Sequence, residues 1–232
     1  MPPSPITLRR ATKADLPRMM RILLDAFAPG PWGRRLFPPH LKVKPGDGDE
    51  YAWRLYMISS GFDNQGCENV LACEGGEGQR GEEIVGWAQW VDSNAEPNGG
   101  MSLDEKKAKM ERELGANPAG LDTEAFETLS REGLRLEARG DEYLGTGRSK
   151  NSWLLSYLLV DPKHHRKGIG RLLAKEGLDR AASQGRDVRL RATPAGRTLY
   201  LALGFEEVCE EKIFGDSQYA MIWRAPSLVR DG

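Results

Sequence analysis

The stretch HHRKGIGRLL, residues 164–173, places two glycines one residue apart between an apolar run and a segment with helical periodicity. Gly168 and Gly170 allow a tight turn, and they let backbone N–H groups approach a ligand where side chains would collide. The helix expected from Ile169 towards Gln184 adds unpaired N–H donors and the positive end of its dipole. Positive charge comes from the neighbouring side chains Arg166, Lys167 and Arg171. The stretch therefore predicts an anion site at a strand-to-helix junction.

Neither of two common nucleotide-binding motifs fits this stretch. A Walker loop needs Gly-x-x-x-x-Gly-Lys-Ser/Thr, and that string does not occur in the chain. A dinucleotide fingerprint needs Gly-x-Gly-x-x-Gly, but Leu173 occupies the third glycine position and no acidic ribose partner follows at the expected distance. A glycine turn that binds nothing is the remaining alternative for this stretch taken alone.

Strand and helix signals alternate along the chain, which is typical of a mixed α/β fold. Residues 152–162 (SWLLSYLLVDP) form a continuous apolar run, as expected of a central strand covered on both faces. Residues 29–49 are so rich in Pro and Gly that we expect a long loop there. The other expected strands are 6–12, 69–75, 82–92, 188–194, 205–214 and 218–225, and the other expected helices are 16–27, 51–60 and 195–204. In the helix after the glycines, Gly177 is expected to permit close approach to the sheet.

Residues 93–150 differ from the rest of the chain because they are charged, punctuated by glycine and helical in spacing. Ser102 and Glu105 have the spacing of a capping box before a helix to about Leu114. A second helix is expected to start at Asp122, with Phe126, Leu129, Gly133 and Leu136 roughly on one face. The segment is either a solvated helical insertion or a lid over a substrate site.

The composition excludes several classes of protein. The 232 residues are 39% hydrophobic and carry a formal net charge of −1, and a chain so close to neutral is not expected to have nucleic acid as its main partner. No apolar run reaches 18 residues and the first residues lack a signal-peptide core, so we expect no membrane span and an intracellular, cytoplasmic protein. The three cysteines are not paired as CxxC and only three histidines occur, which predicts reduced thiols and no metal site.

Two segments resemble the GNAT superfamily of N-acetyltransferases. VDPKHHRKGIGRLL (160–173) is similar to the family's acetyl-CoA-binding segment, whose pattern Gln/Arg-x-x-Gly-x-Gly/Ala falls on residues 165–170. ATPAGRTLYLALGFEEV (192–208) resembles the family's helix–strand junction, with Tyr200, Gly204 and Phe205 in place. The segments 28–40 and 193–196 also resemble uncharacterised fungal members of the superfamily, of the small-molecule type, which implies a small amine or metabolite as substrate.

The resemblance implies an α/β (α+β) fold with a central mixed, mostly antiparallel twisted sheet of six to seven strands, splayed at the signature strand and flanked by helices. It implies one domain over residues 1–232, with residues 93–150 inserted between the third and fourth strands. The implied activity is acetyl-CoA-dependent transfer of an acetyl group to a primary amine, by direct attack in a ternary complex.

The resemblance also implies roles for individual residues. Acetyl-CoA would be bound by the splayed strand and the glycine loop, that is by Leu158, Leu159, Val160, His165, Arg166, Lys167, Gly168, Ile169, Gly170 and Arg171. The family usually has Gln or Arg where this chain has His165, whose imidazole can still donate one hydrogen bond. Tyr200 lies where the family often places the acid that protonates the departing thiolate, and a phenol with a pKa of about 10 suits that role.

The acceptor side and the general base are less defined. The acceptor is expected to contact Trp32, Phe37 and Ser156. No acidic residue lies on the signature strand, and Glu74, Glu83, Asp92 and Asp25 are more typical of structural or solvated carboxylates, so no base is assigned. Three functions stay open, in a monomer or a homodimer: acetylation of a small-molecule amine, acetylation of a protein N-terminus or lysine, and non-catalytic binding of an acyl-CoA.

Overall fold

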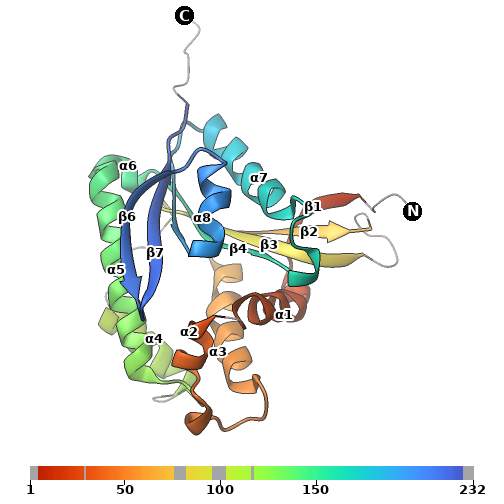
Figure 1. Cartoon of the computed structure of the whole chain (residues 1–232), viewed down its shortest axis with the longest axis vertical. Helices are drawn as coiled ribbons and strands as arrows, with labels where there is room; N and C mark the ends of the chain where they lie inside the picture. Colours follow the sequence, from red (N-terminus) through yellow and green to blue (C-terminus); the bar gives the residue numbers. More distant parts are fainter. Residues whose placement is uncertain (1–4, 29, 76–81, 96–102, 116–117, 227–232) are drawn as a thin grey trace, which may run out of the picture.

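The computed structural model describes residues 5–28, 30–75, 82–95, 103–115 and 118–226. Its centre is a sheet of seven strands in the order β1-β2-β3-β4-β5-β7-β6 (Figure 1). Only β4 and β5 run parallel, and every other neighbouring pair is antiparallel. The strands are β1 (Ile6–Arg10), β2 (Cys67–Glu74), β3 (Glu83–Asp92), β4 (Trp153–Val160), β5 (Val188–Ala192), β6 (Glu206–Ile213) and β7 (Asp216–Trp223). The expected mixed, mostly antiparallel sheet is confirmed.

Helices cover both faces of this sheet. The α-helices are α1 (Leu16–Phe27), α2 (Pro31–Leu36), α3 (Gly48–Ser59), α4 (Leu103–Leu114), α5 (Thr123–Leu144), α6 (Thr146–Lys150), α7 (Ile169–Ser183) and α8 (Pro194–Leu201). Short 3-10 helices are η1 (Lys13–Asp15), η2 (Pro39–Leu41), η3 (Ser60–Asp63) and η4 (Pro162–His164). Figure 1 shows α7 and α8 on one side of the sheet, α1 and α3 on the other, and α5 alongside β6 and β7.

The α7 face of the sheet holds the larger apolar core. Apolar residues recur along α7 at helical spacing, and its buried Leu173 and Leu178 pack against β3 and β4. At Gly177 a Cβ atom would lie 2.1 Å from Cζ2 of Trp90, a fully buried residue of β3. The helix can therefore pack this close only with glycine at that position, as the sequence predicts.

The opposite face is covered by α1, whose amphipathic spacing buries Met19, Met20 and Leu23 against β3 and β4. The indole Nε1 of buried Trp87 donates to the carbonyl of Met19 at 3.1 Å, so the polar atom of this side chain is satisfied inside the core. The two tryptophans of β3 thus point to opposite faces and both are core residues.

The expected long loop at residues 29–49 is wrong in part, because α2 and η2 form within it. Pro31 stands at the start of α2, where its missing N–H breaks no helical hydrogen bond. Leu36 and Phe37 are then buried against Trp53 of α3 and against Leu121. This tertiary burial, which local composition does not reveal, holds a short helix in a Pro- and Gly-rich segment.

Helices α4, α5 and α6 lie between β3 and β4 in the chain. Asp122 caps α5 by accepting the N–H of Ala125 at 2.9 Å, as its position predicts. The buried face of α5, with Leu136, Gly140 and Leu144, packs on the sheet beside β6 and β7. The capping box expected at Ser102 lies outside the described residues. That residues 93–150 are an insertion in a single domain stays a prediction.

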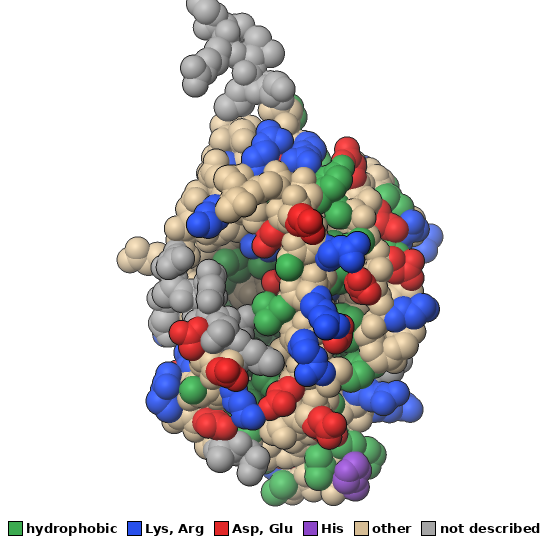
Figure 2. All heavy atoms as spheres, turned by 90° about the vertical axis from the view of Figure 1, so that its left-hand side faces the viewer, with side chains coloured by type: hydrophobic (Ala, Val, Ile, Leu, Met, Phe, Trp, Pro, Cys, Tyr) green, Lys and Arg blue, Asp and Glu red, His purple; other side chains and the backbone are tan. Residues whose placement is uncertain are grey.

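On the face of the molecule turned to the viewer in Figure 2, acidic and basic side chains alternate without a large area of either sign. No helix in the described part of the chain is long and apolar enough to cross a bilayer.

Candidate active site

The sheet opens between its two parallel strands. Strand β4 pairs with β5 only from Trp153 to Leu155, which faces Leu190. Beyond that point β4 continues along β3 as far as Val160, while β5 continues along β7. Gln89 and Trp90 of β3 pair with Tyr157 and Leu155, which leaves Ser156 of β4 as an extra, bulged residue at this opening. The expected splay at the signature strand is therefore present.

The backbone of β4 presents hydrogen-bonding groups to the opening. The N–H of Asp161 donates to Val85 of β3 at 2.8 Å, so the carbonyl of Val160, in the same peptide, points the other way. By strand alternation, the carbonyl of Leu158 and the N–H of Val160 face the same side, whereas the carbonyl of Leu159 faces β3. Leu158 and Val160 thus offer an acceptor and a donor to an extended ligand.

The loop expected to bind phosphate, residues 165–170 and called the phosphate cradle here, follows β4 and the short helix η4. Gly168 caps α7 with φ of 81°, and Arg166 also has positive φ, at 65°, so the loop curls and its N–H groups converge. Apart from its chain neighbours and its own helix, no atom of the described residues lies within 4 Å of the position where a Cβ of Gly168 would stand, so this glycine leaves room for a ligand. A Cβ at Gly170 would instead meet Cδ2 of Leu199 at 3.3 Å, so Gly170 serves packing between α7 and α8. The cradle fits an anionic pyrophosphate.

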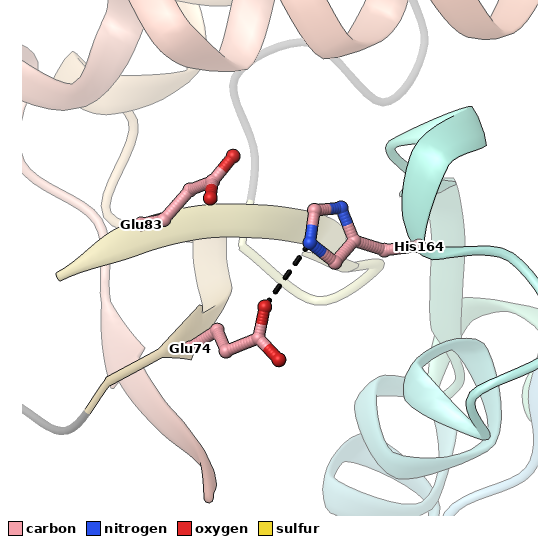
Figure 3. A group of neighbouring side chains, drawn as sticks. All are labelled: Glu74, Glu83 and His164. Carbon is pink, nitrogen blue, oxygen red and sulfur yellow. Dashed lines mark hydrogen bonds and ion pairs between the residues drawn. The ribbon is translucent and has the colours of Figure 1, made fainter. Parts of the chain in front are cut away.

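An ion-pair network anchors this loop to the edge of the sheet. Figure 3 shows Glu74 at the end of β2, Glu83 at the start of β3, and His164 of η4. Nε2 of His164 lies 3.1 Å from Oε2 of Glu74 and donates to it, since a carboxylate only accepts. Nζ of Lys167 lies 3.8 Å from the other oxygen of Glu74, so one carboxylate binds residues on both sides of His165.

Glu74, Glu83 and His164 each offer one metal-ligand atom, all within 4.8 Å of one another. Two cations already neutralise this group, because Arg18 lies 3.3 Å from Glu83 and Lys167 contacts Glu74. In Figure 3 the second ring nitrogen of His164 points away from both carboxylates, and it has no hydrogen-bond partner. The arrangement is that of a loop anchor.

A cavity of about 740 Å³ extends from the phosphate loop through the opening to the opposite face. On the loop side its lining includes His165, Arg166, Gly168, Ile169, Gly170 and Arg171, with Leu158, Leu159 and Val160 of β4. Of the expected cofactor residues, only Lys167 does not line it. The far side is lined by Phe27, Trp32, Trp53 and Tyr157, and by Leu129 and Glu137 of α5.

Tyr200 lines the same cavity from α8 and is 8% exposed. Its ring packs edge-on against Phe205, with centroids 5.5 Å apart. Burial raises the pKa of the Tyr200 hydroxyl well above its usual value of about 10. The phenol therefore keeps its proton at every pH where an acetyltransferase reaction would be run.

Of the three residues expected to contact the acceptor, two line the cavity and one does not. Trp32 and the exposed Ser156 line the cavity. Phe37 does not, because its side chain is 3% exposed and packs against Trp53 with ring centroids 5.7 Å apart. Phe37 therefore supports the wall through Trp53 and does not itself face the cavity.

The carboxylates considered as bases lie outside the cavity lining, and each has a cation partner. Asp25 is 3.1 Å from Arg21, and the Arg186 guanidinium holds the pKa of Asp92 below its usual range. Among the described residues that line the cavity, Glu137 of α5 is the one carboxylate. Sequence reasoning missed it, although its spacing from Gly133 and Leu136 already placed it beside the apolar face of that helix.

Comparison with known proteins agrees with this geometry. Residues 123–219 match the family model described as the acetyltransferase (GNAT) domain. No curated protein matches the chain at a significant level.

Several solved structures share the fold. A histone acetyltransferase HPA2 and related acetyltransferase from Corynebacterium glutamicum has a TM-score of 0.59 and 19% identity, covering 97% of this chain and 98% of its own. The putative acetyltransferase yncA from Salmonella typhimurium, solved with acetyl-CoA, has a TM-score of 0.51 and 17% identity, covering 98% of each chain. The Drosophila melanogaster polyamine N-acetyltransferase has a TM-score of 0.58 and 15% identity, covering 95% of this chain and 100% of its own.

These likenesses show the fold over nearly the whole chain, and the family model marks the domain within it. Residues 123–219 thus match the acetyltransferase (GNAT) domain model, and the whole chain shares its fold with these solved structures.

Proposed function

We propose that this chain is a GNAT acetyltransferase that uses acetyl-CoA as donor and acetylates the primary amine of a small molecule by direct attack in a ternary complex. One observation carries the proposal: a single cavity joins the phosphate cradle at Gly168, the opening between β4 and β5, and an aromatic chamber on the other face. Donor and acceptor can therefore enter from opposite sides and meet at the opening.

The donor half suits coenzyme A in both its charged and its extended parts. The N–H groups of the first turn of α7 have no partner within the helix, so together with Arg166 and Arg171 they can bind an anion. The carbonyl of Leu158 and the N–H of Val160 can pair with the amide groups of the pantetheine arm. The Salmonella structure, solved with acetyl-CoA, supports this placement by its fold.

The reaction needs a neutral amine, a stabilised oxyanion and a proton for the departing thiolate. Acetyl-CoA supplies the thioester carbon that the amine attacks. A backbone N–H at the β4 opening can polarise the thioester carbonyl, and Tyr200 holds a proton for the thiolate sulfur. Overall, an ammonium and acetyl-CoA give the acetamide, CoA thiol and one released proton.

The shape of the acceptor half favours a small molecule over a peptide. Helix α5 adds Leu129 and Glu137 to the lining that Phe27 of α1 and Trp53 of α3 also form, so three helices bound this part of the cavity. The polyamine acetyltransferase from Drosophila, named for a small-molecule substrate, has the same fold and supports this choice.

Two alternatives remain distinct from this proposal. A protein or peptide acetyltransferase would have to admit a chain past α5. A non-catalytic acyl-CoA-binding module would bind the donor without turning over any amine.

The test begins with a thermal shift on acetyl-CoA, with ATP and NADH as controls. A ligand at 100 times its Kd stabilises by about 2.7 kcal/mol, which for a chain of this size raises Tm by roughly 5–10 °C. A shift with acetyl-CoA alone, followed by amine-dependent release of free thiol, supports the proposal. Binding without thiol release across small amines and peptides would establish the non-catalytic module instead.

A further inference from the structure

Two arginines of β5 face two acidic residues of α5. Arg189 and Arg191 are two residues apart on the strand and so lie on the same face of the sheet. Glu137 and Asp141 are four residues apart on the helix and so lie on the same side of it. The two elements pack against each other, which brings the four charges into one layer.

Only one of the two possible ion pairs between these residues forms. Nη1 of Arg189 lies 3.6 Å from Asp141, whose carboxylate also accepts the hydroxyl of Ser149 at 2.6 Å. Arg191 and Glu137 do not pair with each other, and within the described part of the chain neither side chain forms an ion pair or hydrogen bond. The Arg189–Asp141 pair therefore stabilises the fold. Glu137 and Arg191, called the open pair below, have no ion-pair partner among the described residues.

The open pair lies in the acceptor half of the cavity. Both Glu137 and Arg191 line the main cavity, and both also line a small adjoining pocket beside Leu154. Arg191 stands one residue beyond Leu190, where the pairing of β5 with β4 ends. The two charges are therefore next to the opening where the acetyl group would be transferred.

The position of Arg191 is fixed by two contacts that leave its charge uncompensated. Its guanidinium carbon lies 5.6 Å from the ring centroid of Trp32. Its Nη1 would be 2.4 Å from a Cβ at Gly133, so it occupies space that exists because this residue of α5 is glycine. A cation–π contact and a van der Waals contact hold the side chain, but neither provides the planar anion that a guanidinium binds best.

We infer that the open pair recognises a zwitterionic acceptor: Glu137 receives its ammonium group and Arg191 its carboxylate or other anionic group. Two unpaired opposite charges in one partly enclosed cavity are unfavourable without a complementary ligand. A ligand that carries both charges satisfies both residues at once, and the aromatic wall suits an apolar side chain. The substrate class is thus a small amino acid or a similar amino-carboxylate. This inference rests on the proposed function.

The experiment compares matched acceptors by initial rates of free thiol release at saturating acetyl-CoA. The panel contains phenylalanine, phenylalaninamide and phenethylamine, with leucine, leucinamide and isoamylamine as a second series. A charged hydrogen bond contributes about 1.5–3 kcal/mol, so kcat/KM for the acid should exceed that for its amide by roughly 10- to 100-fold. Arg191→Met should remove this preference, lowering kcat/KM on the acids with a change of less than about threefold on the simple amines.

Gly133→Ala gives an independent route to the same result without removing the charge. The new methyl group displaces the Arg191 guanidinium, while alanine in place of glycine favours the helix. The acid preference should therefore fall in a protein at least as stable as wild type. Glu137→Gln should raise KM for every acceptor with the Tm shift on acetyl-CoA unchanged. Glu142→Gln and Arg135→Met, both exposed on α5, are the matched controls. They should change neither the preference for acids nor the KM for acceptors.

The outcomes separate this inference from the proposed function. Two results would refute recognition of a zwitterionic acceptor and leave the proposed acetyltransferase activity standing. One is turnover of amines without a preference for acids. The other is an equal loss of kcat/KM on acids and amines in Arg191→Met. Acetyl-CoA binding with no turnover of any acid in the panel also refutes that recognition. Absence of an acetyl-CoA thermal shift in wild type overturns the proposed function itself.

Discussion

The imidazole Nε2 of His165 lies 3.0 Å from the carbonyl oxygen of Val160. A carbonyl only accepts, so this nitrogen carries the proton and donates. The contact joins the first residue of the phosphate signature to the last residue of β4. His165 thus fixes the start of the loop against the strand, while the backbone N–H groups of the loop remain free for an anion.

The His165 contact predicts a graded response to substitution. His165→Gln keeps a donor and should bind acetyl-CoA within about threefold of wild type. His165→Leu leaves the Val160 carbonyl without this partner and loosens the loop, so Kd for acetyl-CoA should rise by about 3- to 10-fold, within the range expected for the loss of one hydrogen bond of about 0.5–1.5 kcal/mol. Calorimetric titration with acetyl-CoA checks both values. Equal affinity of all three proteins would show that the contact does not order the loop.

The conformation of Gly168 predicts a specific loss of donor binding. Gly168→Val places a β-branched side chain in the open space of the cradle and in the left-handed region, at a cost of about 1–2 kcal/mol in unfolding free energy. Acetyl-CoA binding should be abolished while the protein stays folded. Gly215→Val is the matched control: Gly215 has φ of 88° and a Cβ there would meet no described atom within 4 Å beyond its chain neighbours, but it lies in the turn between β6 and β7. A control variant that also lost binding would trace the effect to stability.

The anchor at Glu74 predicts a change in KM with little change in kcat. Glu74→Gln weakens the contacts to His164 and Lys167 on either side of His165, so the loop must be ordered by the donor itself. KM for acetyl-CoA should rise about 5- to 10-fold, as expected for the loss of about 1 kcal/mol of anchoring. Glu83→Gln, which alters only the exposed contact to Arg18, should leave KM unchanged. A fall in kcat with constant KM would contradict the anchoring role.

Removal of the Tyr200 hydroxyl is expected to slow the chemical step. Tyr200→Phe keeps the packing against Phe205, and the hydroxyl has no hydrogen bond to any described residue, so Tm should change little. Loss of a general acid should lower kcat by about 100-fold with Kd for acetyl-CoA unchanged. Tyr143→Phe, on the exposed side of α5, is the control. Undiminished turnover would show that another donor protonates the thiolate.

The thiols of buried Cys73 and half-buried Cys67 predict that alkaline pH destabilises the fold. Burial raises the pKa of Cys67 to about 11, and burial together with Glu82 raises that of Cys73 to about 12. In the unfolded chain these thiols ionise near pH 8.5. The folded state then binds more protons than the unfolded state, so the unfolding free energy is fully present below pH 8.5 and falls as pH rises towards 11–12.

Urea unfolding at pH 7.5 and pH 10 measures this effect. The double variant Cys67→Ala/Cys73→Ala should show a smaller fall in stability between the two pH values than wild type. An identical fall in both proteins would assign the pH dependence to other groups.

The glycine loop, the positions of the helices that became α1 and α7, and the succession of strands and helices along the chain could be predicted from the sequence. These follow from local rules: glycine where φ is positive, apolar periodicity where a helix meets a sheet, and an apolar run for a central strand. The close approach of α7 to the sheet at Gly177 could also be predicted, because a glycine on the apolar face of a helix commonly marks close packing.

The tertiary structure alone decided α2, the burial of Phe37 and the role of helix α5. Burial of Leu36 against residues distant in sequence made a helix from a segment whose composition suggests a loop. The same long-range packing set Arg191 beside Trp32 and brought Glu137 into the cavity. Such juxtapositions depend on which elements meet across the sheet, and no periodicity within one segment encodes that.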